Sequence, residues 1–168
     1  MQLIVVLHNI RSTYNVGAIL RTAEGLGVFQ VILSGYTPRV HDARLLPYLR
    51  DKLDREIHKT ALGAEELLEI NSSDDIISSL KDLQKQGWQI VGLENNIKDR
   101  RLFRLTDKSI SQRLQDKVVL VLGEEVNGID YSLYDIINLF LEIPMKGKKE
   151  SFNVSVAAGI AMYVIMNL

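Results

Sequence analysis

The sequence predicts an α/β fold in which helices flank a mainly parallel sheet, and three observations support this. Short uninterrupted apolar runs, such as QLIVVL at 2–7 and KVVLVLG at 117–123, are typical of strands buried on both faces. They alternate along the chain with segments of helical periodicity, the order expected of a parallel sheet. The length of 168 residues and the hydrophobic fraction of 46% suit one core. We therefore expect a single domain over residues 1–168.

The first third of the chain predicts a strand, a helix and a second strand. The strands are expected at 2–7 and 29–33. Between them, residues 15–27 predict a helix that is ended by Gly25 and Gly27. Its apolar residues at helical spacing are Val16, Ile19, Leu20, Ala23 and Leu26. Residues 34–60 predict no long element, because Pro38 and Pro47 interrupt them.

The rest of the chain continues the alternation. A helix is expected from about 73 to 86, with Ser72 or Ser73 as cap and Asp74 and Asp75 in its first turn. Strands are expected at 88–94, 117–123 and 139–143, with a short helix near 132–137. A loop at 144–151 leads to a final helix.

The final segment, residues 152–168, carries no charge over 17 residues. This length is the lower limit for a membrane span, which stays a less favoured alternative. Asn153, Ser155 and Asn167 suit lipid poorly, and we expect a helix buried all round, partly against a second subunit. The N-terminus lacks the basic region and cleavage site of a signal peptide, so a cytoplasmic location is expected.

Composition excludes several kinds of site. The chain has no Cys, which excludes disulfides, thiolate nucleophiles and Cys-bound metals, and three scattered His do not suggest a metal centre. Twenty Lys and Arg against 21 Asp and Glu give a net charge of −1. Any nucleic acid must therefore be bound by local basic patches and not by bulk charge.

Parallel sheets bind ligands beyond the carboxyl ends of their strands, which here are expected at 8–15, 94–104, 123–131 and 144–153. The first loop, HNIRSTYN, leads into the helix that carries Arg21. Asn15 and Arg21 are candidate functional residues. The alternative is that Asn15 is only a helix cap and that Arg21 is solvated or paired with Glu24.

Two further clusters follow predicted strands. GEEVNG at 123–128 places adjacent carboxylates between two glycines, a pattern that suits a ligand loop or an acidic surface turn. IPMKGKKESFNVS at 143–155 places three lysines near Ser151 and Asn153, which are also candidate helix caps. The P-loop pattern is absent, and Gln30 stands where a dinucleotide-binding motif needs its third glycine.

The three clusters together resemble the three motifs of the SpoU (TrmH-like) family of RNA ribose 2′-O-methyltransferases in the SPOUT superfamily. The matching segments are NVGAILRTAEGLG, LVLGEEVNG and IPMKGKKESFNVSVAAGIAMY, in that order, and they extend over nearly the whole chain. The resemblance implies a C-terminal trefoil knot, a homodimer and S-adenosylmethionine as methyl donor, with no metal and no membrane partner. Knots are rare exceptions to general connection rules.

The resemblance also implies site residues. The expected polar active-site residues are Arg21, Asn15, Glu125, Ser151 and Asn153. The donor is expected against Leu93, Glu94, Leu122, Gly123, Gly128, Ile143, Met145 and Phe152. Phe152 stands where the family usually has Leu.

RNA recognition is expected on the surface of the domain, because the chain begins just before the first motif and lacks the N-terminal RNA-binding extension of many relatives. The expected RNA-binding residues are Arg11, Arg39, Arg44, Arg100, Arg101, Lys146, Lys148 and Lys149. The substrate class implied is tRNA or rRNA. Two alternatives remain open at this point: an inactive RNA-binding protein of the same fold, and a different α/β nucleotide-binding enzyme.

Overall fold

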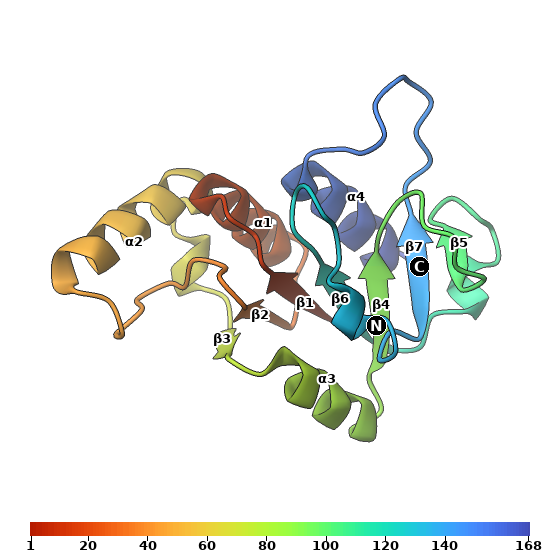
Figure 1. Ribbon diagram of the computed structural model, residues 1–168, viewed down its shortest axis with the longest axis horizontal. Coiled ribbons are helices and arrows are strands. Elements are labelled where there is room, and N and C mark those ends of the chain that lie inside the picture. The colour runs from red at the N-terminus through yellow and green to blue at the C-terminus, as the bar shows by residue number, and fades with distance from the viewer.

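A parallel sheet of seven strands forms the centre of the computed structural model, which describes all residues from 1 to 168 (Figure 1). The order across the sheet is β3-β2-β1-β6-β4-β7-β5, and every neighbouring pair is parallel. The strands are β1 (Gln2–His8), β2 (Gln30–Ser34), β3 (Ile70–Ser73), β4 (Gln89–Leu93), β5 (Leu102–Arg104), β6 (Lys117–Leu122) and β7 (Leu139–Glu142). The predicted α/β class is confirmed.

Helices cover both faces of this sheet. Figure 1 shows α1 and α4 on one face, α2 beyond α1 at one end of the molecule, and α3 on the opposite face. The helices are α1 (Thr13–Gly25), α2 (Pro47–Ala61), α3 (Ile76–Lys85) and α4 (Val154–Met166). Three short 3-10 helices complete the fold: η1 (Ala64–Glu66), η2 (Ile110–Gln112) and η3 (Tyr131–Leu133).

Two hydrophobic cores, one on each face, explain why the interior positions of the central strands β1 and β6 are apolar. In β1, Leu3, Val5 and Leu7 pack towards α1 and α4. Ile4 and Val6 of the same strand pack on the other side, with α3. Successive side chains of a strand point to opposite faces, so a strand covered on both sides has no solvent-facing residue.

Several predicted elements differ from the structure. Residues 34–60 contain α2, because Pro47 occupies its first turn, where proline is favoured and does not break a helix. The strands β3 and β5 were not predicted, since each is short, partly exposed and at a sheet edge. The cap of α3 is Asp75, whose side chain accepts the backbone N–H of Ser78. Residues 131–133 form the 3-10 helix η3 where a longer helix was expected.

Within the single chain the last helix is buried on one side only, and the predicted burial of its other side against a second subunit stays a prediction. Ala158, Ala161 and Met162 of α4 are fully buried, whereas Val156 and Tyr163 are 49% and 61% exposed. The structure contains no helix that combines the length and the hydropathy needed to cross a bilayer.

The sheet order decides where functional residues can meet. Strands β1, β6, β4 and β7 are consecutive in the sheet and point the same way. The loops that follow their carboxyl ends are therefore neighbours at one edge of the sheet.

Candidate active site

A cleft opens beyond the carboxyl ends of β4, β6 and β7. Its cavity volume is about 180 Å³, and it is partly open to solvent. Its wall is made of residues from four segments: Leu93, Glu94, Asn95, Leu122, Gly123, Glu124, Glu125, Val126, Gly128, Ile143, Ser151, Phe152, Asn153, Val154 and Ala157. The topology thus joins segments up to 64 residues apart in the sequence.

The loop after β6 folds back on itself and requires glycine at both ends. The backbone N–H of Glu124 donates to the Gly128 carbonyl, and that of Gly128 to the Glu124 carbonyl, each at 2.9 Å. A Cβ at Gly123 would overlap the backbone of Gly128 and Ile129. Gly128 has φ +72°, and a Cβ there would overlap the Glu94 carboxylate. The glycines at these two positions thus let the wall of the cleft close tightly.

Glu94, at the end of β4, holds this loop in place. Its Oε2 accepts the backbone N–H of Ile129 at 2.8 Å, and its Oε1 accepts that of Asn95 at 3.0 Å. Burial raises the pKa of Glu94, and the two N–H donors offset this only in part, so the pKa stays above its ordinary value.

Asn95 is a site residue that the sequence prediction missed. Its amide nitrogen donates to the Ile143 carbonyl at 3.0 Å, and its oxygen accepts the Ile143 N–H at 3.0 Å. The same nitrogen lies 3.4 Å from the Glu150 carbonyl. Asn95 therefore ties the end of β4 to both ends of the loop after β7. Its position two residues after a buried strand was the available signal.

Three predicted polar residues meet at the rim of the cleft. Asn15 Nδ2 donates to Glu125 Oε1 at 3.1 Å, and Asn153 Nδ2 donates to Asn15 Oδ1 at 3.2 Å. The backbone N–H groups of Arg11 and Ser12 also donate to the Glu125 carboxylate, at 3.2 and 3.4 Å. Burial raises the pKa of Glu125, but these hydrogen bonds outweigh it and hold the pKa below its ordinary value.

The helix-cap alternatives are resolved differently for the two asparagines. The cap of α1 is Ser12, whose hydroxyl accepts the backbone N–H of Asn15 at 3.3 Å, so the Asn15 side chain is free to bind Glu125. Asn153 is the cap of α4, accepting the Ser155 N–H at 2.8 Å. Its oxygen performs the capping while its nitrogen reaches Asn15, so the cap is confirmed and a role of Asn153 in the reaction stays a prediction.

Three predicted residues lie outside the cleft wall: Asn15, which reaches its rim through Glu125 and Asn153, and also Arg21 and Met145. Arg21 is exposed, and no ion pair joins it to Glu24. It follows Asn15 by six positions, a rotation of about 240° round the helix, so it cannot face the same side. Within one chain, the Arg21 side chain therefore does not face the cleft.

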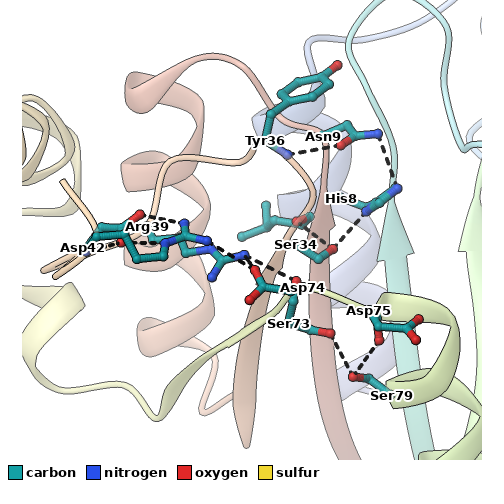
Figure 2. A network of polar contacts seen from close by, with 12 residues as sticks. His8, Asn9, Ser34, Tyr36, Arg39, Asp42, Ser73, Asp74, Asp75 and Ser79 are labelled. Carbon is teal, nitrogen blue, oxygen red and sulfur yellow. Dashed lines mark hydrogen bonds and ion pairs between the residues drawn. The ribbon is translucent and has the colours of Figure 1, made fainter.

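A buried network lies beneath the first polar cluster (Figure 2). The ring of His8 bonds Ser34 Oγ through Nδ1 at 2.9 Å and accepts from Asn9 Nδ2 at 3.2 Å. Burial lowers the pKa of His8, in spite of the opposing charge of Asp130. His8 and Asn9 therefore connect the ends of β1 and β2 and are structural.

Three of the predicted RNA-binding arginines have structural partners. Arg39 is buried and pairs with Asp74 (Figure 2), and Arg44 pairs with Asp42 at 2.6 Å. Arg101 pairs with Asp99 at 2.6 Å and donates to the carbonyls of Tyr134 and Ile137. Their charges are largely neutralised. Only the Asp74 partner of Arg39 is distant in the sequence; Asp42 and Asp99 lie two residues from their arginines, a local signal that the sequence prediction missed. Arg11 pairs with Glu124. The remaining predicted residues are exposed and make no ion pair: Arg100, Lys146, Lys148 and Lys149.

The profile of the SpoU rRNA Methylase family matches residues 2–163 of this chain. The chain belongs to that family. Among curated SpoU-type relatives, it is 33% identical over 164 residues to the 23S rRNA (guanosine-2'-O-)-methyltransferase RlmB of Xylella fastidiosa, covering 96% of this chain and 57% of that protein. It is 32% identical over 171 residues to the human mitochondrial rRNA methyltransferase 1, covering 98% and 45%. The chain spans about half the length of the curated relatives it matches.

Solved structures of similar proteins show the same fold. An AdoMet-bound rRNA methyltransferase from Sinorhizobium meliloti superposes with a TM-score of 0.78 at 21% identity, covering 99% of this chain and 56% of that one. A protein described in connection with 2-OH methylation of C/U34 on tRNA gives 0.74 at 22% identity, covering 96% and 92%. At these identities, the likeness establishes the SpoU fold alone.

Proposed function

We propose that residues 1–168 form a single methyltransferase domain that uses S-adenosylmethionine to methylate a ribose 2′-hydroxyl of tRNA or rRNA. The observation that carries the proposal is the meeting of Asn15, Glu125 and Asn153 at the rim of the cleft beyond β4, β6 and β7. Membership of the SpoU family supports the reaction class. The printed names of the relatives support an RNA substrate.

The cleft suits S-adenosylmethionine in its chemistry. Leu93, Ile143 and Phe152 supply apolar wall for an adenine, while Glu124 and Glu125 supply negative charge beside it, appropriate to a cationic ligand. When bound, S-adenosylmethionine would provide an electrophilic methyl group on a sulfonium. The residues that would hold S-adenosylmethionine are the predicted donor-binding residues without Met145, to which Asn95 is added: Leu93, Glu94, Asn95, Leu122, Gly123, Gly128, Ile143 and Phe152.

The polar residues have distinct proposed roles. Glu125 fixes the loop after β6 against the start of α1, and Asn153 fixes the start of α4 against Asn15. Asn15 and Ser151 would then orient the ribose. Arg21 would stabilise the negative charge that develops on the 2′-oxygen, or hold the adjacent phosphate. Because a guanidinium is always protonated in proteins, the proton leaves to phosphate or water.

We infer that the active form is a homodimer. The uncharged α4 exposes Val156 and Tyr163, and Phe152 just before it is 41% exposed. Contact through this apolar face and the neighbouring exposed face of α1 would bury these side chains. It would also bring Arg21 of one subunit to the cleft of the other, which accounts for its position outside its own cleft.

The proposed fold includes the C-terminal trefoil knot that the resemblance implies. Asn95 donates hydrogen bonds to the carbonyls of Ile143 and Glu150, at the two ends of the loop after β7. These bonds support the proposal that this loop forms part of the knot. Single-molecule stretching from the two termini tests this. A knotted chain should extend to less than the roughly 3.5 Å per residue of an unknotted one, and full extension would contradict the knot.

RNA binding is proposed for the exposed cations Arg11, Arg100, Lys146, Lys148 and Lys149. Arg11 pairs with Glu124 but keeps a side chain that is 67% exposed, whereas Arg39, Arg44 and Arg101 are left out. A cytoplasmic location stays a prediction.

Methyl transfer to RNA tests the proposed function. The protein is incubated with tritiated S-adenosylmethionine and total RNA from a strain that lacks it, and the product is mapped for 2′-O-methyl groups. Incorporation at a ribose is expected. Absence of incorporation with intact RNA binding would favour the inactive RNA-binding protein. Equilibrium dialysis in which NAD binds and S-adenosylmethionine does not would favour a different nucleotide-binding enzyme.

A further inference from the structure

The helix α2 presents a row of basic residues on its outer side, apart from the cleft. Tyr48, Lys52, Arg55 and Lys59, here called the α2 ridge, are all exposed and follow one another at intervals of four, three and four residues. At about 100° per residue these four positions fall within roughly 60° of one another. Ile57, the buried residue of α2, lies on the opposite side.

The carboxylates of α2 face other groups. Asp51 pairs with Arg50 at 3.3 Å, and Asp54 pairs with His41 at 3.0 Å. Glu56 accepts the hydroxyl of Thr13 at 3.2 Å. No carboxylate lies within 4.0 Å of the charged groups of the three ridge cations. The ridge is therefore a local concentration of uncompensated positive charge on a protein of net charge −1.

Exposed aromatic rings accompany this charge. Tyr48 is 66% exposed at one end of the ridge, and Tyr14 of α1 is 49% exposed at the other. Lys59 Nζ lies 5.9 Å from the centre of the Tyr14 ring, so the ridge continues onto α1. Arg21 follows Tyr14 by seven residues, two turns along the same face of α1. The ridge thus leads towards the arginine that the proposed function assigns to the reaction.

We propose that the α2 ridge is an RNA-binding surface that holds the sugar–phosphate backbone of the substrate beyond the nucleotide that enters the cleft. This rests on the proposed function for the identity of the substrate. Lys52 and Lys59 are separated by about 10.5 Å of helix, so the ridge cations can contact more than one phosphate of the same strand. Three cations flanked by an exposed ring at each end favour a polynucleotide over an acidic protein, because bases stack on aromatic side chains.

The place of α2 in the molecule agrees with this role. It lies at one end, with α1 between it and α4 (Figure 1). A dimer contact through α4 therefore leaves the outer side of α2 open to RNA. The lysines of the loop after β7 and the α2 ridge would contact different parts of the same polyanion.

The test compares two triple variants with equal change of charge. Lys52→Gln/Arg55→Gln/Lys59→Gln removes the ridge cations, and Lys81→Gln/Lys85→Gln/Lys108→Gln removes exposed cations elsewhere. Binding is measured with a fluorescein-labelled 20-nucleotide oligouridylate and with unfractionated tRNA, without methyl donor. The ridge variant should bind roughly ten- to a hundredfold more weakly, and its salt slope should fall by about 2, whereas the control stays within about twofold of wild type.

Equal loss of affinity in both variants, or an unchanged salt slope in the ridge variant, would overturn the proposal. So would loss of binding to vesicles containing phosphatidylserine with RNA affinity intact, because that would make the ridge a membrane surface. S-adenosylmethionine binding is measured separately by calorimetry and should be the same in both variants. If the wild-type protein does not bind S-adenosylmethionine while the ridge variant alone has reduced RNA affinity, the proposed reaction is wrong and the proposal for the α2 ridge is upheld.

Discussion

Replacing Gly123 by alanine adds only one methyl group, but it should distort the wall of the cleft. The added methyl group would point into the place where the loop after β6 closes, against the backbone of Gly128 and Ile129. Backbone cannot rotate away as a flexible side chain can. The loop must therefore open, which breaks the paired 2.9 Å hydrogen bonds between Glu124 and Gly128 and displaces the wall of the cleft.

The magnitude follows from these contacts. Overpacking at a buried position costs about 1–3 kcal/mol, and each of the two backbone hydrogen bonds contributes about 1 kcal/mol. We expect Gly123→Ala to lower the free energy of unfolding by about 3 kcal/mol. For a chain of this length that corresponds to a fall in Tm of about 6–12 °C.

Thermal unfolding at one fixed protein concentration measures the effect, since subunit association would make Tm depend on concentration. The matched control is Gly25→Ala, at the end of α1, where a Cβ would meet nothing within 4 Å. It should raise stability by about 0.5–1 kcal/mol. Calorimetry should show S-adenosylmethionine binding lost in Gly123→Ala and kept in the control. If Gly123→Ala melts within about 2 °C of wild type and binds the donor normally, the close approach described here is wrong.

Three further predictions concern other contacts. Asn153→Ser keeps a good helix cap but loses the amide that reaches Asn15. The free energy of unfolding should stay within about 0.5 kcal/mol of wild type, whereas the rate of methyl transfer should fall at least tenfold. An unchanged rate would show that Asn153 acts only as a helix cap. The hydrogen bonds that the His41 ring donates to Glu66 and Asp54 raise the pKa of His41 above 6.5. The stabilisation by His41 is therefore complete below pH 6.5 and lost as pH rises through the folded pKa. His41→Asn should flatten the dependence of Tm on pH between 6 and 8, and an unaltered dependence would contradict this. Arg21→Ala and Gly123→Ala chains, each inactive alone, should recover methyl transfer to about a quarter of wild type when they are mixed and exchange subunits, because half of the dimers are mixed and each mixed dimer has one intact site of two. No recovery in verified mixed dimers would show that Arg21 does not act across the dimer.

Local patterns predicted the buried part of the fold well. The runs at 2–7 and 117–123 could only be strands covered on both faces, and β1 and β6 lie side by side in the centre of the sheet. The edge strands β3 and β5 were missed because short, half-exposed strands are defined by their neighbours and not by their own apolar pattern. The helix α2 was missed because its surface is largely polar and it begins at a proline.

The site shows the same division. Polar clusters after predicted strands marked the loops that meet at the cleft, since parallel strands end at one edge of the sheet. The sequence could not show that Asn95 bonds to both ends of the loop after β7, nor that Arg39 pairs with Asp74. Those contacts join residues that only folding brings within reach.

By itself, the sequence determined the α/β class, the strands of the core and the loops that carry the polar residues, because hydrophobic periodicity and turn chemistry act over a few neighbouring residues. Only the tertiary structure decided which side chains meet. Strand order placed Asn15, Glu125 and Asn153 in one hydrogen-bonded group across more than 100 residues of chain, and helix rotation turned Arg21 away from them.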